Sequence, residues 1–353
     1  MSVYDNAKAV LALSEPDPEY SQFILANKQP QLEFSYPLVQ AVRQRTFAAE
    51  QQRTAKAIES GRLEECRTIT MRDGFESEIR IHRPRVKPND GSPLIVLAFG
   101  GGFVFGNVLQ MGGTARILND LYGATVVCIS YRLAPEHPWP QSHEDAWDSL
   151  VWIAQHASSL GADANRGFVI GGASAGANIS AVLAQRSLSD KLAVPLTGAW
   201  LNMPMIFKTA ENVPEKYRPL YLSDEQNANV PGLLNKSALE YIRSAVKGNG
   251  FSAMFSPVNA ERPHVGMPPV FIQACGMDVV RDDALVYERM LRDNGVKTKV
   301  VVYAGVPHGH QTLFPSLAKS KQAKFDTIEG IGELLGKTVS RTDVENAFIA
   351  SAS

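Results

Sequence analysis

Short apolar runs that alternate with helix-like segments constrain this chain more than any other feature. The six runs have the length of β-strands, and several are rich in Val and Ile. They cover Leu94–Phe99, Thr125–Ser130, Phe168–Ile170, Ala199–Asn202, Val270–Cys275 and Val300–Tyr303. Helix-like segments separate most of them, around residues 111–122, 142–157, 174–187 and 282–294. Continuous apolar strands between helices indicate a mostly parallel sheet that helices cover on both faces. We therefore predict a protein of the α/β class.

Two long segments do not follow this alternation of strands and helices. Residues 1–60 look helical and polar with few aliphatic residues, so we expect them to pack onto the rest of the chain rather than to fold alone. Between Met203 and about Asn259 no convincing strand occurs, and the composition turns polar with several prolines. Such a long interruption between core strands indicates an inserted cap or a functional loop region.

A hairpin is predicted ahead of the parallel strands. Thr68–Met71 and Ser77–Arg83 are strand candidates, and they flank Asp73-Gly74, a favourable turn sequence. Ile79 and Ile81 alternate with polar residues, as expected for a half-exposed antiparallel pair.

Composition and charge exclude several kinds of partner. The chain has 353 residues, a formal net charge of −1 and no block of like charges, so neither nucleic acid nor an anionic membrane surface is an expected partner. Its longest apolar runs are far too short to span a bilayer. The first residues show no basic stretch followed by an apolar core, and we therefore expect a cytoplasmic protein, although a secreted protein without its leader would look the same. Cys66, Cys128 and Cys275 have no metal-like or redox-like spacing, and we expect buried, inert thiols.

The sequence Gly172-Ala173-Ser174-Ala175-Gly176 lies directly between a predicted strand and a predicted helix. A G-x-S-x-G at such a position is typical of the nucleophile elbow, in which a tight, strained turn exposes the serine hydroxyl above the strand ends. The bare pentapeptide is a weak signal, because small residues are common in loops. Its place between strand and helix makes Ser174 the predicted nucleophile.

Three consecutive glycines follow the first parallel strand, in Phe99-Gly100-Gly101-Gly102-Phe103. Such glycines allow backbone N–H groups to point into a cavity, and acyl transfer needs these donors because its tetrahedral intermediate carries an oxyanion. Three glycines alone are also compatible with a merely flexible loop. Together with the serine turn, they favour an oxyanion-binding loop.

A base is expected on the loop after the last predicted strand. His308 lies there, and loops beyond the carboxyl ends of parallel strands form the sites of such folds. An imidazole at this place can accept the Ser174 proton and return it to the leaving group. Metal binding by His308 and His310 is the alternative, but no third ligand has a suitable spacing. We therefore expect no metal, and we place His310 beside the substrate pocket.

The orienting carboxylate is expected after another strand. Asp278 directly follows Val270–Cys275 and can fix the imidazole tautomer. Asp282 and Asp283 are its rivals, but we expect them to begin the next helix, where acidic residues complement the helix dipole. The chain order of serine, aspartate and histidine is that of α/β-hydrolases.

With these motifs the sequence resembles the hormone-sensitive-lipase-like group of α/β-hydrolases over about residues 93–310. The resemblance rests on Phe99–Phe103, Gly172–Asn178, Gly276–Asp283, Pro307-His308-Gly309 and, most particular to the group, Tyr131–Pro138. It implies Ser174 as nucleophile, Asp278 as acid, His308 as base, and backbone oxyanion donors at Gly101, Gly102 and Ala175. Relatives usually have histidine where this chain has Phe99, and often an acidic residue where it has Ala173, so both changes remove polar support from the site.

The resemblance also implies the organisation of the chain. It implies an α/β-hydrolase fold with a mostly parallel central sheet, helices on both faces and a helical cap. Residues 1–60 would be an N-terminal cap segment, and 61–340 the catalytic domain with a cap insertion at about 204–259. Residues 341–353 would be a C-terminal tail.

We expect a serine esterase that acts on a small or medium apolar ester, with a natural-product intermediate among the candidate substrates, and that needs no cofactor. Phe103 and His310 are the expected substrate-binding side chains. A lyase, cyclase or acyltransferase on the same scaffold is the alternative, because a fold does not determine the chemistry of its site. A small-molecule receptor is disfavoured because the triad is complete. The assembly is left open, with a homodimer as one option.

Overall fold

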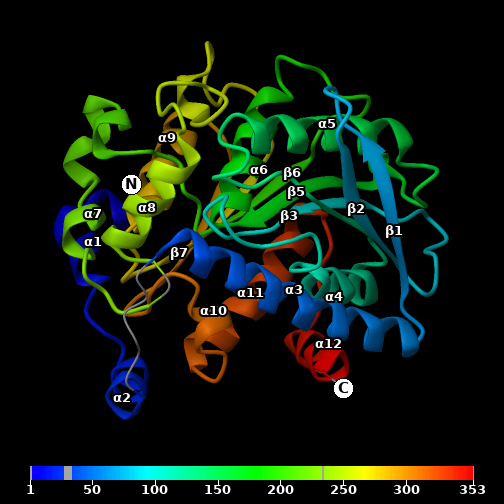
Figure 1. The fold of residues 1–353 in the computed structure, drawn as a ribbon, viewed down its shortest axis with the longest axis horizontal. Helices are drawn as coiled ribbons and strands as arrows, with labels where there is room; N and C mark the ends of the chain where they lie inside the picture. The colour runs from blue at the N-terminus through cyan, green and yellow to red at the C-terminus, as the bar shows by residue number, and fades with distance from the viewer. Residues whose placement is uncertain (1, 28–33, 233, 353) are drawn as a thin grey trace.

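A single eight-stranded sheet runs through the protein in the order β1-β2-β4-β3-β5-β6-β7-β8 (Figure 1). The computed structural model describes residues 2–27, 34–232 and 234–352. Within these residues the strands are β1 Leu63–Thr70, β2 Glu76–Arg83, β3 Leu94–Ala98, β4 Thr125–Ile129, β5 Phe168–Ala173, β6 Gly198–Asn202, β7 Val270–Cys275 and β8 Thr298–Tyr303. From β4 to β8 all neighbours in the sheet pair in parallel, and only β1–β2 and β2–β4 are antiparallel. The expected α/β class is confirmed.

Helices cover both faces of this sheet, as the alternating pattern predicted. The main ones are α3 Tyr36–Glu59, α4 Gly112–Tyr122, α5 Gln141–His156, α6 Ala175–Arg186, α9 Arg281–Asp293, α11 Ala318–Leu334 and α12 Arg341–Ala352. Helix α6 packs on β3, β5 and β6 with α5 beside it, whereas α4 and α11 pack on the other side, against β2, β4, β6 and β7. The parallel strands β3 to β7 are almost wholly buried between these layers. Their continuous apolar sequences follow from burial on both faces.

The hairpin forms where the sequence predicted it, but its first strand is longer. Strand β1 begins at Leu63, because the polar stretch before Thr68 pairs its backbone with β2 along the full length of the strand. Cys66 lies in this polar stretch and is exposed, so the expectation of three buried thiols is wrong for Cys66 and correct for the other two. The sequence did not indicate this part of the strand, because its side chains are mostly polar and lack the apolar alternation of a half-buried strand.

The segment between β6 and β7 contains no strand within its described residues, in line with the sequence. It forms the short helix α7 Ser223–Gln226, the amphipathic helix α8 Lys236–Val246, and three 3-10 turns, η3 Ala210–Asn212, η4 Glu215–Leu220 and η5 Pro257–Asn259. In Figure 1 this segment lies together with the N-terminal helix α1 Ala7–Ala12 at one end of the sheet. The short helices η1 Val3–Asp5, α2 Pro18–Ala26, η2 Ala164–Arg166 and α10 His310–Leu313 complete the described elements. A cap function for these segments stays a prediction.

Helix α3 is docked onto the glycine loop by one side chain. The Arg43 guanidinium donates to the carbonyl oxygens of Val104 (2.8 Å) and Ala134 (2.6 Å) and to the Glu136 carboxylate (2.7 Å). The Tyr36 hydroxyl donates to the same carboxylate at 2.6 Å. Charge-assisted contacts of this kind are the strong ones among protein hydrogen bonds. The N-terminal segment therefore makes direct contact with the loop that follows β3 and supports it.

The C-terminal segment, which the sequence analysis described as a tail, contains a helix. Residues 341–352 form α12, which packs against α4 and α11, and Val344 is fully buried there. Across the described residues, no helix is both long enough and apolar enough to cross a membrane.

The Glu136 carboxylate should stabilise the docked α3 in a pH-dependent way. Partial burial raises its pKa, but the hydrogen bonds from Arg43 and Tyr36 outweigh that effect and lower the pKa to about 2. A carboxylate whose pKa is lower in the folded state stabilises the protein above the unfolded pKa, and this contribution is lost as the pH falls through the folded pKa. We expect Glu136→Gln to lower the free energy of unfolding by about 1 kcal/mol at pH 7. In urea titrations the difference from wild type should shrink between about pH 4.5 and pH 2.

Glu225→Gln is the matched control, because that carboxylate is largely exposed and its one ion pair among the described residues is with Lys236. Its effect should stay within a few tenths of a kcal/mol at every pH. A Glu136→Gln difference that is unchanged at pH 2.5 would contradict the assignment.

Candidate active site

Ser174 occupies the sharp turn between β5 and α6. Its backbone has φ 55° and ψ −115°, which is outside the conformations that residues with a side chain prefer. The turn is held because the Ser174 N–H donates to the Asn202 carbonyl (2.7 Å) and the Ser174 carbonyl accepts from the Asn178 N–H (3.0 Å). A strained residue at a strand-to-helix turn is the geometry that the G-x-S-x-G motif predicts.

The two glycines of the motif are required by close backbone contacts. A Cβ atom at Gly176 would overlap the carbonyl oxygens of Ala98 and Phe99 at the end of β3. A Cβ at Gly172 would lie 2.5 Å from the Ala98 carbonyl oxygen and 2.6 Å from Gly176. The serine turn and the start of the glycine loop therefore touch through their backbones, which places Ser174 beside the glycine loop.

The structure brings Ser174, His308 and Asp278 together in a hydrogen-bonded row. His308 Nε2 lies 3.0 Å from Ser174 Oγ, and His308 Nδ1 lies 2.5 Å from Asp278 Oδ2. Asp278 follows β7 and His308 follows β8, so neighbouring strands deliver the two partners. The side chains of His308 and Asp278 are 4% and 1% exposed, which keeps bulk water from competing for these bonds. An Nδ1–H donated to Asp278 leaves Nε2 free to accept the serine proton.

Three backbone N–H groups beside Ser174 have no acceptor. Among the described residues, the N–H groups of Gly101, Gly102 and Ala175 donate no hydrogen bond. Ala175 is the first residue of α6, so its N–H is one of the unpaired donors of a helix N-terminus, where negative charge is favoured. Unpaired donors of this kind, gathered beside a serine hydroxyl, can bind an oxygen that acquires negative charge.

Phe99 supports the glycine loop by stacking. Its ring lies on that of Tyr131 with centroids 4.1 Å apart and planes 11° from parallel. The Tyr131 hydroxyl donates to the Phe99 carbonyl at 2.7 Å. Apolar stacking and one buried hydrogen bond thus hold the loop without a polar side chain at position 99.

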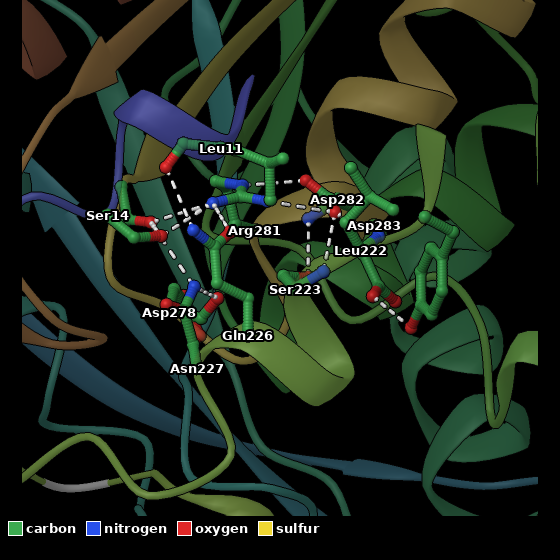
Figure 2. A network of polar contacts seen from close by, with 12 residues as sticks. Leu11, Ser14, Leu222, Ser223, Gln226, Asn227, Asp278, Arg281, Asp282 and Asp283 are labelled. Carbon is green, nitrogen blue, oxygen red and sulfur yellow. Dashed lines mark hydrogen bonds and ion pairs between the residues drawn. The ribbon is translucent and has the colours of Figure 1, made fainter. Parts of the chain in front are cut away.

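The rival acids Asp282 and Asp283 lie in the first turn of α9, as expected. Their main contacts, however, are hydrogen bonds to the segment between β6 and β7 (Figure 2). Asp282 Oδ2 accepts the N–H groups of Leu222 and Ser223, at 2.6 and 2.7 Å. Asp283 accepts the Tyr221 hydroxyl at 2.9 Å and the N–H groups of Ile206 and Phe207, both at 2.7 Å. Burial raises the pKa of Asp283 to about 7, although these three donors act to lower it. Both carboxyls therefore attach the segment between β6 and β7 to the start of α9.

A buried arginine joins this attachment to the N-terminal segment. Arg281 is almost wholly buried and pairs with Asp282 at 2.7 Å, while its Nη1 donates to Ser14 (2.8 Å) and Gln226 (3.0 Å), as Figure 2 shows. Asn227 Nδ2 donates to the Asp278 carbonyl at 2.8 Å. Sequence reasoning missed these residues, since a basic residue beside two acids in a first helical turn is usually a solvated surface group.

The loops that carry Asp278 and His308 also rest on the N-terminal segment. The Gly305 N–H donates to the Leu13 carbonyl (2.8 Å), and the Asp17 N–H donates to the Gly305 carbonyl (2.9 Å). A Cβ at Gly305 would overlap the backbone of Glu15 and Asp17, so this contact also depends on a glycine. The segment around Leu13 to Asp17 therefore helps to fix the positions of the loops that carry Asp278 and His308.

The two predicted substrate-binding residues lie in different surroundings. Phe103 lines a small apolar cavity beside the glycine loop. His310 is fully buried, its Nδ1 lies 2.9 Å from Ser320 Oγ, and burial lowers its pKa to about 3. Its ring packs near Tyr303 rather than toward Phe103. These contacts give no support to a substrate-binding role for His310.

No metal site is evident in the described part of the chain. No group of three or more His, Cys, Asp or Glu side chains there is placed to hold an ion. His308 and His310 turn to different partners, Asp278 and Ser320, instead of converging.

Comparisons with known proteins give one consistent family. The family model described as alpha/beta hydrolase fold matches residues 95–312. An AB hydrolase superfamily protein of Schizosaccharomyces pombe is 32% identical over 275 residues, which cover 78% of this chain and 80% of that protein. The esterase LipI of Mycobacterium tuberculosis is 34% identical over 235 residues, 65% of this chain and 70% of its own length. Among solved structures, vibralactone cyclase superposes with a TM-score of 0.83 at 30% identity, and the match covers 93% of this chain and 97% of that one.

The strained turn at Ser174 should be measurable in the stability of the protein. Glycine adopts a positive φ without the steric conflict of a Cβ, so we expect Ser174→Gly to be more stable than Ser174→Ala by about 1 kcal/mol in urea unfolding. The matched control is Ser180, in the middle of α6, where Gly should be less stable than Ala by about 1 kcal/mol. The same sign at both positions would show that the turn stores no strain.

Proposed function

Because the chain belongs to the α/β-hydrolase family, in its hormone-sensitive-lipase-like group, we propose that it is a serine carboxylesterase that hydrolyses small or medium apolar esters. The observation that carries the proposal is the row Asp278–His308–Ser174 beside three N–H donors without acceptors. Esterases among the similar proteins support the same class of reaction.

In the first half-reaction Ser174 becomes acylated. His308 Nε2 takes the hydroxyl proton while Oγ forms a bond to the ester carbonyl carbon, and the carbonyl π electrons move onto its oxygen. The N–H groups of Gly101, Gly102 and Ala175 stabilise that oxyanion, and Asp278 stabilises the imidazolium. The carbonyl re-forms, the bond to the alcohol oxygen breaks, and the imidazolium gives its proton to the departing alcohol.

In the second half-reaction water replaces the alcohol. His308 removes a proton from water as its oxygen bonds to the acyl carbon, and the same three donors hold the second oxyanion. When this intermediate collapses, the bond to Ser174 Oγ breaks and His308 returns the proton to Oγ. One ester and one water have then become one acid and one alcohol, and the enzyme is restored without a cofactor.

The expected substrate is a small-molecule ester with an apolar character, and natural-product intermediates are among the candidates. The apolar lining around Phe103 supports this character. Cytoplasmic location and assembly as a homodimer stay predictions from the sequence.

A non-hydrolytic reaction on the same residues is the second candidate, and the similarity to vibralactone cyclase favours it. In a cyclase or acyltransferase the acyl group would pass to an internal or external alcohol instead of to water. Turnover of a candidate substrate in H₂¹⁸O separates the two reactions by mass spectrometry. Hydrolysis places one ¹⁸O atom in the carboxylic acid product, whereas cyclisation or acyl transfer leaves the product unlabelled.

The triad can be tested with p-nitrophenyl acetate and p-nitrophenyl butyrate. We expect the wild type to release p-nitrophenolate, and Ser174→Ala and His308→Ala to lower kcat by at least about 10³-fold. Asp278→Asn should lower kcat by about 10³- to 10⁴-fold with little change in fold, because the amide favours the wrong imidazole tautomer. A fluorophosphonate probe should label the wild type at Ser174, as peptide mass spectrometry can verify.

Ser180→Ala, on the same helix as Ser174, and His156→Ala, at the end of α5, are the controls, and both should keep wild-type rates. Absence of turnover together with absence of labelling at Ser174 would rule out the esterase. Labelling without turnover of either ester would favour the non-hydrolytic candidate.

A further inference from the structure

Asn178 takes no part in the reaction steps above, yet it is fully buried one helical turn after Ser174 in α6. Its N–H donates to the Ser174 carbonyl at 3.0 Å. Its side-chain Nδ2 donates to the carbonyl oxygens of Met205, at 2.6 Å, and Phe255, at 2.8 Å. Met205 lies near the beginning of the segment between β6 and β7, and Phe255 lies beyond α8, the last α-helix of that segment. One amide group therefore ties two distant parts of the segment to the helix that follows the candidate nucleophile.

A buried histidine fixes the orientation of this amide. Asn178 Oδ1 lies 2.8 Å from Nε2 of His143, a residue of α5. Because both N–H bonds of the amide point at carbonyl oxygens, only Oδ1 can face the histidine; the opposite orientation would place Oδ1 against those two carbonyls. An amide oxygen only accepts, so His143 Nε2 must carry a proton. His143 Nδ1 then accepts from the Ser142 hydroxyl, which lies 3.2 Å away.

The surroundings of the His143 ring keep it neutral. The residue is 1% exposed, and burial lowers its pKa to about 4, although the bond to Asn178 acts in the opposite direction. The centroid of its ring lies 5.4 Å from that of Phe103 and 6.0 Å from that of Phe255. Phe103 belongs to the glycine loop, so α5, α6, that loop and the stretch before η5 meet around one neutral histidine.

The same amide also acts on the loop that carries His308. The stretch 202–205 begins at the carbonyl that accepts the N–H of the serine turn, and within it Met203 Sδ accepts the N–H of Gly309 at 3.2 Å. Gly309 directly follows His308. Met203 has φ 52°, a left-handed conformation that persists only where neighbouring contacts hold it. Residues 202–205 therefore join the serine turn to the base loop, and Asn178 holds their far end.

We propose that Asn178 and His143 are positioning residues for the candidate triad. The Nε2–H of His143 keeps the Asn178 amide in the orientation that holds residues 202–205, and this stretch sets the place of the base relative to the nucleophile. Both residues act through others rather than on the substrate. Their role in turnover rests on the proposed esterase function, whereas the orientation of the amide and its effect on the base do not.

Two substitutions that differ in reach test the hydrogen bond to Asn178. His143→Gln places an amide N–H near the position of Nε2, whereas the shorter side chain in His143→Asn reaches only the position of Nδ1. Both variants bury one uncharged amide, so a general loss of packing affects both. With p-nitrophenyl butyrate, we expect His143→Gln to keep kcat/KM within about threefold of wild type and His143→Asn to lower it by about 10- to 100-fold. Equal values for the two variants would overturn the proposal.

His264 is the matched control, because it is fully buried and neither of its ring nitrogens has a hydrogen bond within the described chain. His264→Gln and His264→Asn should therefore have similar kcat/KM values. A difference there as large as the one at position 143 would show that the two side chains differ in packing alone, and it would overturn the inference.

Nuclear magnetic resonance tests the same contacts without turnover. In wild-type protein with ¹⁵N-labelled histidine, His143 should be neutral at pH 7 with its proton on Nε2. The His308 Nδ1–H, whose nitrogen lies 2.5 Å from Asp278 Oδ2, should give a strongly downfield proton signal. That signal should be retained in His143→Gln and shifted or broadened in His143→Asn.

These spectra separate a failure of the esterase function from a failure of the positioning role. If no ester is hydrolysed and Ser174 is not labelled, a His308 signal that responds only to His143→Asn would still support the positioning role. A proton on His143 Nδ1, or a His308 signal that is the same in both variants, would overturn it. If neither variant folds, the tautomer of His143 in the wild type remains the test.

Discussion

The close approach of two backbones at the end of the sheet is the constraint on which the site depends. The serine turn lies directly against the end of β3. At Gly172 and at Gly176 there is no room for a side chain between the turn and β3. This contact fixes the backbone of Ser174 relative to the start of the glycine loop. A donor set that is fixed before the substrate arrives needs no reorganisation when charge develops, which is the main source of electrostatic catalysis.

The remaining partners are held by a buried polar network rather than by apolar packing. Arg281 and Asp282 form an ion pair without exposed atoms, and it is linked to Ser14, Gln226 and Ser223. Removing charges from water is so unfavourable that such a pair is weak evidence for added stability. Its geometric effect is clearer, because directional bonds join Ser14, the segment after β6 and the loop that carries Asp278 in one arrangement (Figure 2).

The sequence predicted those features that depend on local pattern and missed those that depend on contacts between distant segments. The parallel strands, the hairpin turn and the serine turn follow from periodicity and from glycines at fixed spacings, and the structure has them at the expected places. Strand β1 was placed too short because its polar side chains carry no apolar alternation. Nothing near Arg43 in the sequence indicates that it would bind the loop after β3, since its partners lie 61 to 93 residues away. The side chain of His310 could not be oriented from its neighbours, because the preference of its ring for Ser320 is decided by packing against α11.

The contacts of the loops that carry Asp278 and His308 with Leu13 and Ser14 have a consequence for synthesis. Leu13 and Ser14 leave the ribosome early, but their partners Gly276 and Gly305 are translated more than 260 residues later. At cellular elongation rates this delay is roughly 15–60 s. During that time Leu13 and Ser14 cannot form these hydrogen bonds, because their partners do not yet exist. A nascent chain can therefore form much of its central sheet before the loop after β8 is translated, and only then can that loop bind Leu13 and bring together two parts of the polypeptide that were made far apart in time.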